Sequence, residues 1–171
     1  MPPAPARARE PSRMPPAPPR DREPSRMPPA PDRDRDASGR ARQQRPRDAL
    51  GRPLAYGAVG VEPVSEEPLP PMETIAAARA RLREGRPFSA HEVLEARWKA
   101  APEGERDLWQ GLAQICVGLT HAARGNATGS AALRARGAAR LDTNAVGEGT
   151  AYGLDVADIA ARARRAQPPW A

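Results

Sequence analysis

The amino-acid sequence predicts an all-α protein, with about five helices in a mostly antiparallel bundle that follows a long disordered N-terminal arm. Of the 22 prolines, 18 precede residue 72, and that part of the chain has no apolar periodicity long enough to build a core. After residue 72, apolar residues recur at helical spacing. Residues 108–123 contain no charged side chain, which is typical of a helix that is covered on most sides.

This distribution predicts three parts of the chain. Residues 1–52 form a Pro/Arg-rich disordered arm, in which a 13-residue repeat begins at Met1, Met14 and Met27. Met27 is therefore a candidate alternative start. Residues 53–71 form a linker or a docking strap, and residues 72–167 form the helical domain. A domain of that size is marginally stable alone, so association with a second copy or with a protein partner would help it.

The N-terminal part contains one short motif twice, as RDASGR at residues 35–40 and as RDALGR at residues 47–52. An Arg-Asp pair with a glycine three residues after the aspartate predicts a tight turn that presents guanidinium groups. The segment LAYGAVGVEPV, residues 54–64, has enough apolar residues to dock on the domain as a strap. The weak candidates for a contact with nucleic acid or phosphate are Arg40, Arg42, Arg45, Arg47 and Arg52.

The first predicted helix covers residues 73–84. Ile75, Ala78 and Leu82 fall on one helical face, which predicts that this face packs in the core. Gly85 is expected to end the helix, because glycine accepts the left-handed backbone conformation that follows many helices.

The second predicted helix begins at Ser89, which together with Glu92 makes an S-x-x-E capping box. On a helix, His91 and Glu95 lie on the same stripe as Trp98. The imidazole and the carboxylate are therefore expected at the edge of the core and not in bulk water.

The third predicted helix covers residues 105–124 and carries a polar stripe opposite its apolar face. Gln110, Gln114 and His121 make up this stripe. Buried amides and imidazoles left without a partner cost about 1–3 kcal/mol each, so the stripe is expected to bond to the imidazole and carboxylate of the second helix. The apolar face is formed by Leu108, Leu112, Ile115 and Leu119.

The last two predicted helices cover residues 128–141 and about 155–168. Asp155 is expected to cap the fifth helix with its carboxylate. Gly137 weakens the fourth helix, because glycine has a low helix propensity. In the third helix, Gly111 allows another helix to approach closely.

Charge and cysteine content limit the classes of function. The net charge is +6, but residues 1–71 hold 13 arginines against 10 acidic residues, and the remainder is equally mixed. Neither half is strongly basic, which argues against nucleic acid as the main partner. The single cysteine, Cys116, excludes an internal disulfide and lies in an apolar run, which predicts a buried thiol. Residues 108–123 are too short and too polar to cross a bilayer, and the polar N-terminus argues against a signal peptide, so we expect a cytoplasmic protein.

Three blocks of the sequence, RPFSAHEVLEARW, LWQGLAQICVGLTHAARGN and YGLDVADIAARA, together resemble the signature of the domain of unknown function 309 family of small all-helical bacterial proteins. The segment GRARQQRPRDALGRPLAYG is similar to an extension of actinobacterial-type members. The resemblance spans about residues 73–165, implies an all-helical fold and brings no established activity. It places the polar signature of the family on His91, Glu92, Glu95, Trp98, Gln110, Gly111, Gln114, His121, Gly125 and Asn126.

Three functional interpretations stay open. In the first, the protein is an interaction or structural module, and a buried His/Glu/Gln network fixes the packing of its helices. In the second, His91 and Glu95, with His121, serve a metal-dependent or acid/base enzyme that acts on a small molecule through an unknown cofactor, if any. In the third, the Arg-rich arm binds nucleic acid weakly. The candidates for the network or for a ligand site are His91, Glu92, Glu95, Trp98, Gln110, Gln114, His121 and Asn126.

Overall fold

The computed structural model describes residues 45–144 and 151–170, and the predicted five-helix, all-α fold is confirmed there, with no β-strand in these two ranges. Most of the predicted arm, residues 1–44, lies outside the described part of the chain. No helix of the described part is long and apolar enough to cross a membrane. The helices are α1 (Pro71–Arg83), α2 (Pro87–Ala100), α3 (Arg106–Ala123), α4 (Ala127–Asn144) and α5 (Val156–Arg164), with short 3-10 helices η1 (Glu103–Glu105) and η2 (Ala151–Gly153).

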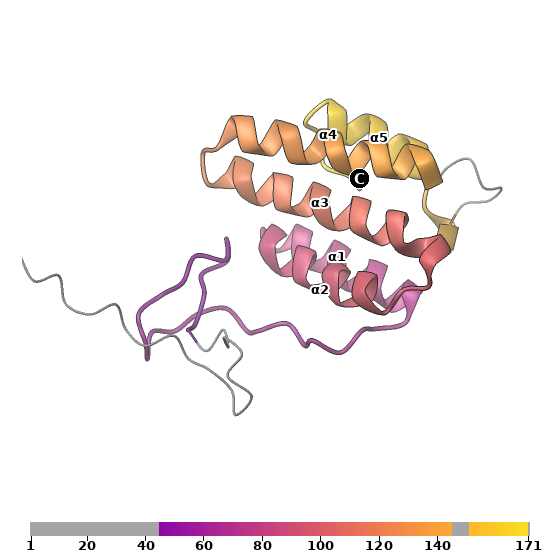
Figure 1. Ribbon diagram of the computed structural model, residues 1–171. Coiled ribbons are helices and arrows are strands. Elements are labelled where there is room, and N and C mark those ends of the chain that lie inside the picture. The colour runs from indigo at the N-terminus through magenta and orange to yellow at the C-terminus, as the bar shows by residue number, and fades with distance from the viewer. Residues whose placement is uncertain (1–44, 145–150, 171) are drawn as a thin grey trace, which may run out of the picture. The chain divides into compact units, whose positions relative to one another are not determined.

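Helix α3 lies in the middle of the bundle. It packs against α2 and against α4, while α1 packs on α2 and α5 packs on α4 (Figure 1). Two layers of side chains therefore meet on α3, which explains why its central stretch carries no charge. Leu108, Leu112 and Ile115 are almost completely buried, as their helical spacing predicts. Trp109 and Cys116, beside this face on the same helix, are buried as well.

Helices α3 and α4 approach each other through a pair of glycines. A Cβ atom on Gly111 would lie 2.9 Å from the carbonyl oxygen of Gly137, and one on Gly137 would lie 2.6 Å from the carbonyl oxygen of Gly111. Real Cβ atoms do not come that close to a backbone oxygen. Close approach at Gly111 is thus confirmed, and Gly137 serves the same contact in addition to weakening its own helix.

The predicted capping box at Ser89 and Glu92 is wrong. Helix α2 begins two residues earlier, at Pro87, with Arg86 at the N-cap position and no side-chain cap. Proline is favoured at the first position of a helix, because its φ angle is already helical and no N–H is left without a partner there. Ser89 is instead buried in the first turn, and its hydroxyl accepts a hydrogen bond from Arg86 at 3.3 Å.

Three other helix ends have clear local determinants, two of which, Asp155 and Gly85, the sequence predicts. The carboxylate of Asp155 accepts a hydrogen bond from the N–H of Asp158 at 2.9 Å, which confirms the predicted cap of α5. The amide oxygen of Asn126 does the same for the N–H of Gly129 in the first turn of α4. Gly85 follows α1 with a φ of 70°, as its role as a helix stop requires.

Residues 45–61 form a segment without helix that lies against the bundle, and we call it the strap. The residues that contact the helices most closely, 47–52, fall in the part of the chain that was expected to belong to the arm. Farther along, Tyr56 and Val59 are 55% and 97% exposed, so the apolar segment that was expected to dock does so only in part.

Candidate functional site

Helix α2 carries a ladder of three charged or titratable side chains along one face. The Nε2 atom of His91 lies 3.4 Å from a carboxylate oxygen of Glu95, and the Nζ atom of Lys99 lies 3.1 Å from the other oxygen. The three residues are spaced four apart, so one turn of helix separates each from the next. The His91 side chain is 20% exposed and the Glu95 side chain 32% exposed, which places them at the edge of the core as the sequence predicts.

Burial disfavours the charged form of His91. Removal of water from the ring lowers its pKa below the usual value of 6.5, and the Lys99 ammonium lowers it further. The Glu95 carboxylate raises the pKa, but its effect is smaller than that of burial. The buried Nδ1 atom of His91 makes no hydrogen bond of normal geometry with the described residues. A ring of this kind can accept a proton only at a cost to the fold.

Glu92 responds to burial in the opposite sense. Desolvation raises the pKa of its carboxyl group above 4.5, and the negative charge of Glu95 adds to the rise. The guanidinium groups of Arg47, on the strap, and Arg86 oppose the shift. An imidazole with a lowered pKa and a carboxyl group with a raised pKa therefore follow each other on α2, and Arg47 of the strap is one of the charges that oppose the rise at Glu92.

A tight turn in the strap presents its backbone to the helices. The Asp48 carboxylate accepts hydrogen bonds from the N–H groups of Leu50 and Arg52, at 3.0 and 2.8 Å. The N–H of Gly51 bonds to the Asp48 carbonyl at 2.9 Å, and Gly51 has a φ of 75°, which glycine adopts without strain. The turn predicted from the Arg-Asp-x-x-Gly motif is therefore confirmed.

The turn rests on Phe88 and Arg124, which together we call the Phe88 site. The guanidinium group of Arg47 lies 5.4 Å from the centre of the Phe88 ring, and that of Arg124 lies 5.9 Å from it. Arg124 also donates to the carbonyl oxygen of Leu50, at 3.0 Å from Nε and through Nη2. Each cation over a ring face is stabilising by about 0.5–1 kcal/mol at an exposed site. The Phe88 site thus binds a peptide backbone and one arginine of the strap.

Only glycine fits at the centre of this contact. A Cβ atom on Gly51 would lie 2.2 Å from the Cγ atom of Phe88, well inside the contact distance of two carbon atoms. Gly51 is itself buried, although it belongs to an irregular segment. The strap therefore docks by backbone contact on an aromatic ring, which is a specific fit and not a loose apposition.

The candidates from the sequence separate into groups that are not bonded to one another. No hydrogen bond joins Gln110 or Gln114 to His91 or Glu95 among the described residues, and the buried Oε1 atom of Gln114 has no partner there. The expected bonds between the second helix and the glutamines of the third are therefore absent. Trp98 packs against the core at its edge.

His121 belongs to the turn between α3 and α4. Its Nδ1 atom lies 3.0 Å from the Asn126 amide nitrogen, and Asn126 caps α4 with its oxygen. The spacing of five residues between the two side chains matches the helix stop at Gly125, which has a φ of 80°. This pair holds the turn and does not extend to His91.

The strap arginines that were considered for nucleic acid take part in contacts within the chain. Arg45 donates to the carbonyl oxygen of Leu54 at 3.0 Å and lies over the Tyr56 ring. Arg47 donates to the carbonyl oxygen of Gly51 at 2.6 Å. Arg52 is exposed, and two further candidates, Arg40 and Arg42, lie outside the described residues.

A second polar cluster, centred on Glu105, was not predicted. Its carboxylate accepts hydrogen bonds from the Trp109 indole at 2.9 Å, from Arg97 at 3.2 Å and from the Tyr152 hydroxyl at 2.7 Å. The bond from Trp109 is the main reason that the pKa of Glu105 lies below its usual value. The bond to Glu105 raises the pKa of Tyr152.

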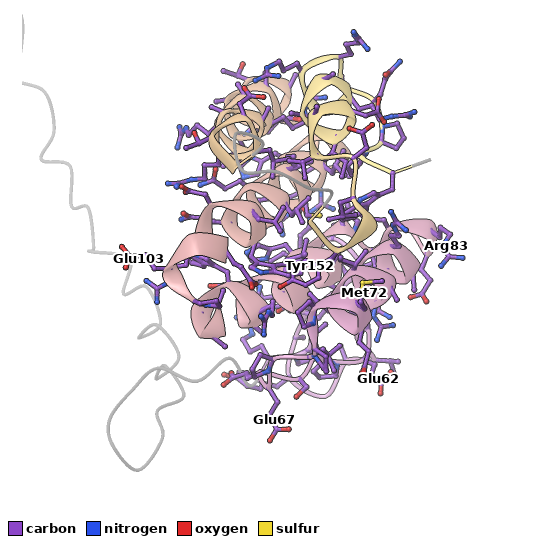
Figure 2. All side chains as sticks on the ribbon, turned by 90° about the vertical axis from the view of Figure 1, so that its right-hand side faces the viewer. Glu62, Glu67, Met72, Arg83, Glu103 and Tyr152 are labelled. Atoms are coloured by element: carbon purple, nitrogen blue, oxygen red, sulfur yellow. The ribbon has the colours of Figure 1, made fainter. Side chains whose placement is uncertain are left out.

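Tyr152 adopts a left-handed backbone conformation with a φ of 58°, which is uncommon for a residue other than glycine. Its ring lies 5.6 Å from that of Trp109. Figure 2 shows Tyr152 against the helices, whereas Glu67 and Glu103 point away from the protein. Sequence spacing gave no signal for this contact, because 47 residues separate Tyr152 from Glu105.

Two further chemical possibilities can be judged from the geometry. Cys116 is completely buried, as predicted, and burial raises the pKa of its thiol to about 12, so it is not a nucleophile at neutral pH. Within residues 45–144 and 151–170, no three His, Cys, Asp or Glu side chains gather in a way that could hold a metal ion.

The comparison with known families supports the resemblance indicated by the sequence. The model of the family described as Domain of unknown function (DUF309) matches residues 75–133, which extend from α1 to the first half of α4. This range contains Phe88, the polar ladder of α2 and Asn126. No curated protein and no solved structure was found to match the chain.

Proposed function

We propose that the helical domain is an interaction module that binds an arginine-bearing protein segment, in a tight-turn conformation, at the Phe88 site. One observation carries this proposal: residues 47–52 are seated on the bundle with Gly51 against the Phe88 ring and the Leu50 carbonyl bonded to Arg124. These contacts use a backbone turn, one arginine and one ring; backbone hydrogen bonds and aromatic rings both recur in the recognition of short segments. In this chain the site holds the strap of the same molecule.

The polar residues of α2 support the site from beneath. The His91 ring lies 5.7 Å from the Phe88 ring, and the Glu92 carboxyl group interacts electrostatically with Arg47 of the strap. Substituting these residues would therefore affect a bound segment through ring packing and charge. On this proposal the polar signature maintains a docking surface, and a hydrogen-bonded network across the bundle is not required.

A peptide-binding measurement tests the proposal. Gly51→Val displaces residues 47–52 from the site, because the new side chain collides with Phe88 and disfavours the positive φ. Gly39→Val is added because residues 35–40 repeat the motif. A labelled peptide of residues 45–62 should bind the full-length double variant, as followed by fluorescence anisotropy, and binding should weaken at least tenfold when Phe88→Ala is added. Equal binding with and without Phe88 would refute the proposed site.

A second candidate function is acid/base chemistry on a small molecule, through His91 with Glu92 or Glu95. The observation that favours it is the pair of opposite pKa shifts on neighbouring residues, since such shifts are common at catalytic positions. Assay of the purified protein against ester, amide and phosphoester panels tests it. Turnover lost in His91→Gln but kept in Lys99→Gln would support the enzyme, and turnover kept in both would reject it.

A further inference from the structure

The strap contacts the Phe88 site through a short sequence motif, and this motif occurs twice in the chain. Residues 33–40 read RDRDASGR, and residues 45–52 read RPRDALGR, twelve positions later. The two octapeptides differ at only two positions. The docked copy is the second, and the first lies outside the described residues.

Each side chain that the docked motif needs has a counterpart in the upstream motif. Arg47, over the Phe88 ring, corresponds to Arg35, and Asp48, which closes the turn, corresponds to Asp36. Gly51, where no Cβ atom fits, corresponds to Gly39.

The two differences between the motifs leave these contacts intact. Leu50 becomes Ser38, but Arg124 bonds only to the backbone carbonyl at that position, which any residue supplies. Pro46 becomes Asp34, which keeps the carbonyl group that accepts from the N–H of Leu54 in the docked strap. The loss of the half-buried Leu50 side chain favours the downstream motif.

We propose that residues 35–40 are a second ligand of the Phe88 site and compete with residues 47–52 of the same chain for it. This inference rests on the proposed function. Both motifs are tethered to α1, so each reaches the site at a high effective concentration without a second molecule. The longer tether of the upstream motif is a small disadvantage, since the entropy of loop closure grows slowly with length.

Binding of the upstream motif changes the surface of the protein. When residues 35–40 occupy the site, residues 47–52 leave it, and Arg47 and the Leu50 carbonyl lose their contacts with Phe88 and Arg124. The site is therefore occupied either by residues 47–52 or by residues 35–40. Substitution of Gly51 shifts this equilibrium toward occupation by residues 35–40.

The single phenylalanine of the chain makes the experiment direct, because ring-labelled phenylalanine gives the NMR signals of Phe88 alone. Spectra are compared for the full-length wild type, Gly39→Val, Gly51→Val and the double variant. The wild type and Gly39→Val should have the same chemical shifts for the Phe88 ring, which are those of the docked state. Gly51→Val should stay near those chemical shifts, because the upstream motif takes over, and the double variant should move to a distinct, undocked position.

Two results would overturn one or both proposals in distinguishable ways. If the Phe88 signals of Gly51→Val shift as far as those of the double variant, the second ligand is refuted while docking of the strap at Phe88 stands. If the signals shift in neither Gly51→Val nor the double variant, the Phe88 site itself is refuted. Circular dichroism confirms that the helices persist, since neither glycine lies in a helix of the described chain or in its predicted helices.

A peptide in trans completes the test. A peptide of residues 33–42, RDRDASGRAR, should return the ring signals of the full-length double variant toward the docked positions. The same peptide with valine in place of Gly39 has an identical charge and should have no effect. If a peptide of residues 45–62 restores the signals and the 33–42 peptide does not, the upstream motif is not a ligand.

Discussion

His91 shows how its surroundings set the chemistry of a residue whose position the sequence predicts well. The helical spacing with Trp98 indicates the edge of the core, and the His91 side chain is indeed mostly buried there. A nearby carboxylate would be expected to favour the charged ring, yet burial outweighs it and the pKa falls. The sequence places the imidazole, but only the depth of burial decides its protonation state.

The lowered pKa of His91 predicts how stability depends on pH. As pH falls below about 6.5, the unfolded chain binds more protons at this histidine than the folded protein does, so the free energy of unfolding falls. In His91→Gln this contribution is absent. The stability difference between wild type and His91→Gln, measured by urea unfolding, should therefore narrow as pH falls from about 7.5 to 5.5.

The titration of Glu92 changes the stability with pH in the opposite sense to that of His91. The raised pKa of Glu92 stabilises the fold fully below pH 4.5, and the contribution is lost as pH rises through the folded pKa. Glu92 is present in both proteins, so its effect largely cancels in the difference. If the stability difference between wild type and His91→Gln widens as pH falls, the lowered pKa of His91 is contradicted.

At the scale of elements, the contact of α3 with α4 shows that a poor helix former can be required by packing. Propensity alone marks Gly137 as a weak point, because glycine in a helix costs about 1 kcal/mol relative to alanine. The structure gives the reason for its presence: backbone oxygens of Gly111 and Gly137 occupy the space where side chains would lie. Stability gained by closer packing offsets the loss of propensity.

Gly137→Ala should therefore destabilise the protein, although the same change in an open helix is stabilising. We expect a loss of about 1–3 kcal/mol, typical of overpacking at a tight contact, measured by thermal or chemical unfolding. Gly104→Ala is a matched control, because nothing lies within 4 Å of its Cβ position. Equal effects of the two substitutions would show that α3 and α4 separate easily.

The beginning of α2 illustrates a competition between two start signals. The S-x-x-E pattern at Ser89 and the proline at residue 87 both indicate a helix start, two residues apart. The structure uses the proline, and the serine is buried with Arg86 as its partner. As a result, Glu92 has no capping role, and its carboxyl group interacts electrostatically with Arg47 of the strap.

For the whole molecule, the Glu105 cluster connects elements that are far apart in the chain. Arg97 from α2, Trp109 from α3 and Tyr152 from the segment before α5 all donate to one carboxylate. This arrangement fixes the segment before α5 against the junction of α2 and α3. The left-handed conformation of Tyr152 is tolerated because its side chain is held at both the ring and the hydroxyl.

Tyr152→Phe should lower the free energy of unfolding by about 1 kcal/mol at pH 7, because it removes one hydrogen bond to a carboxylate and keeps the ring. The effect should shrink below about pH 4.5. The lowered pKa of Glu105 means that its contribution is present above that value and is lost as its carboxylate is protonated. A pH-independent difference in urea unfolding would show that the hydroxyl does not act through Glu105.

The sequence by itself determined the number of helices, their approximate limits, the buried face of α3 and the turn at residues 48–51. These follow from local rules, since helical periodicity and turn chemistry act over a few residues. Only the tertiary structure decided that the turn rests on Phe88, that the glutamines of α3 do not bond to His91, and that Tyr152 meets Glu105. Such contacts depend on how helices pack and which segments the packing brings together, and spacing along the chain carries no information about that.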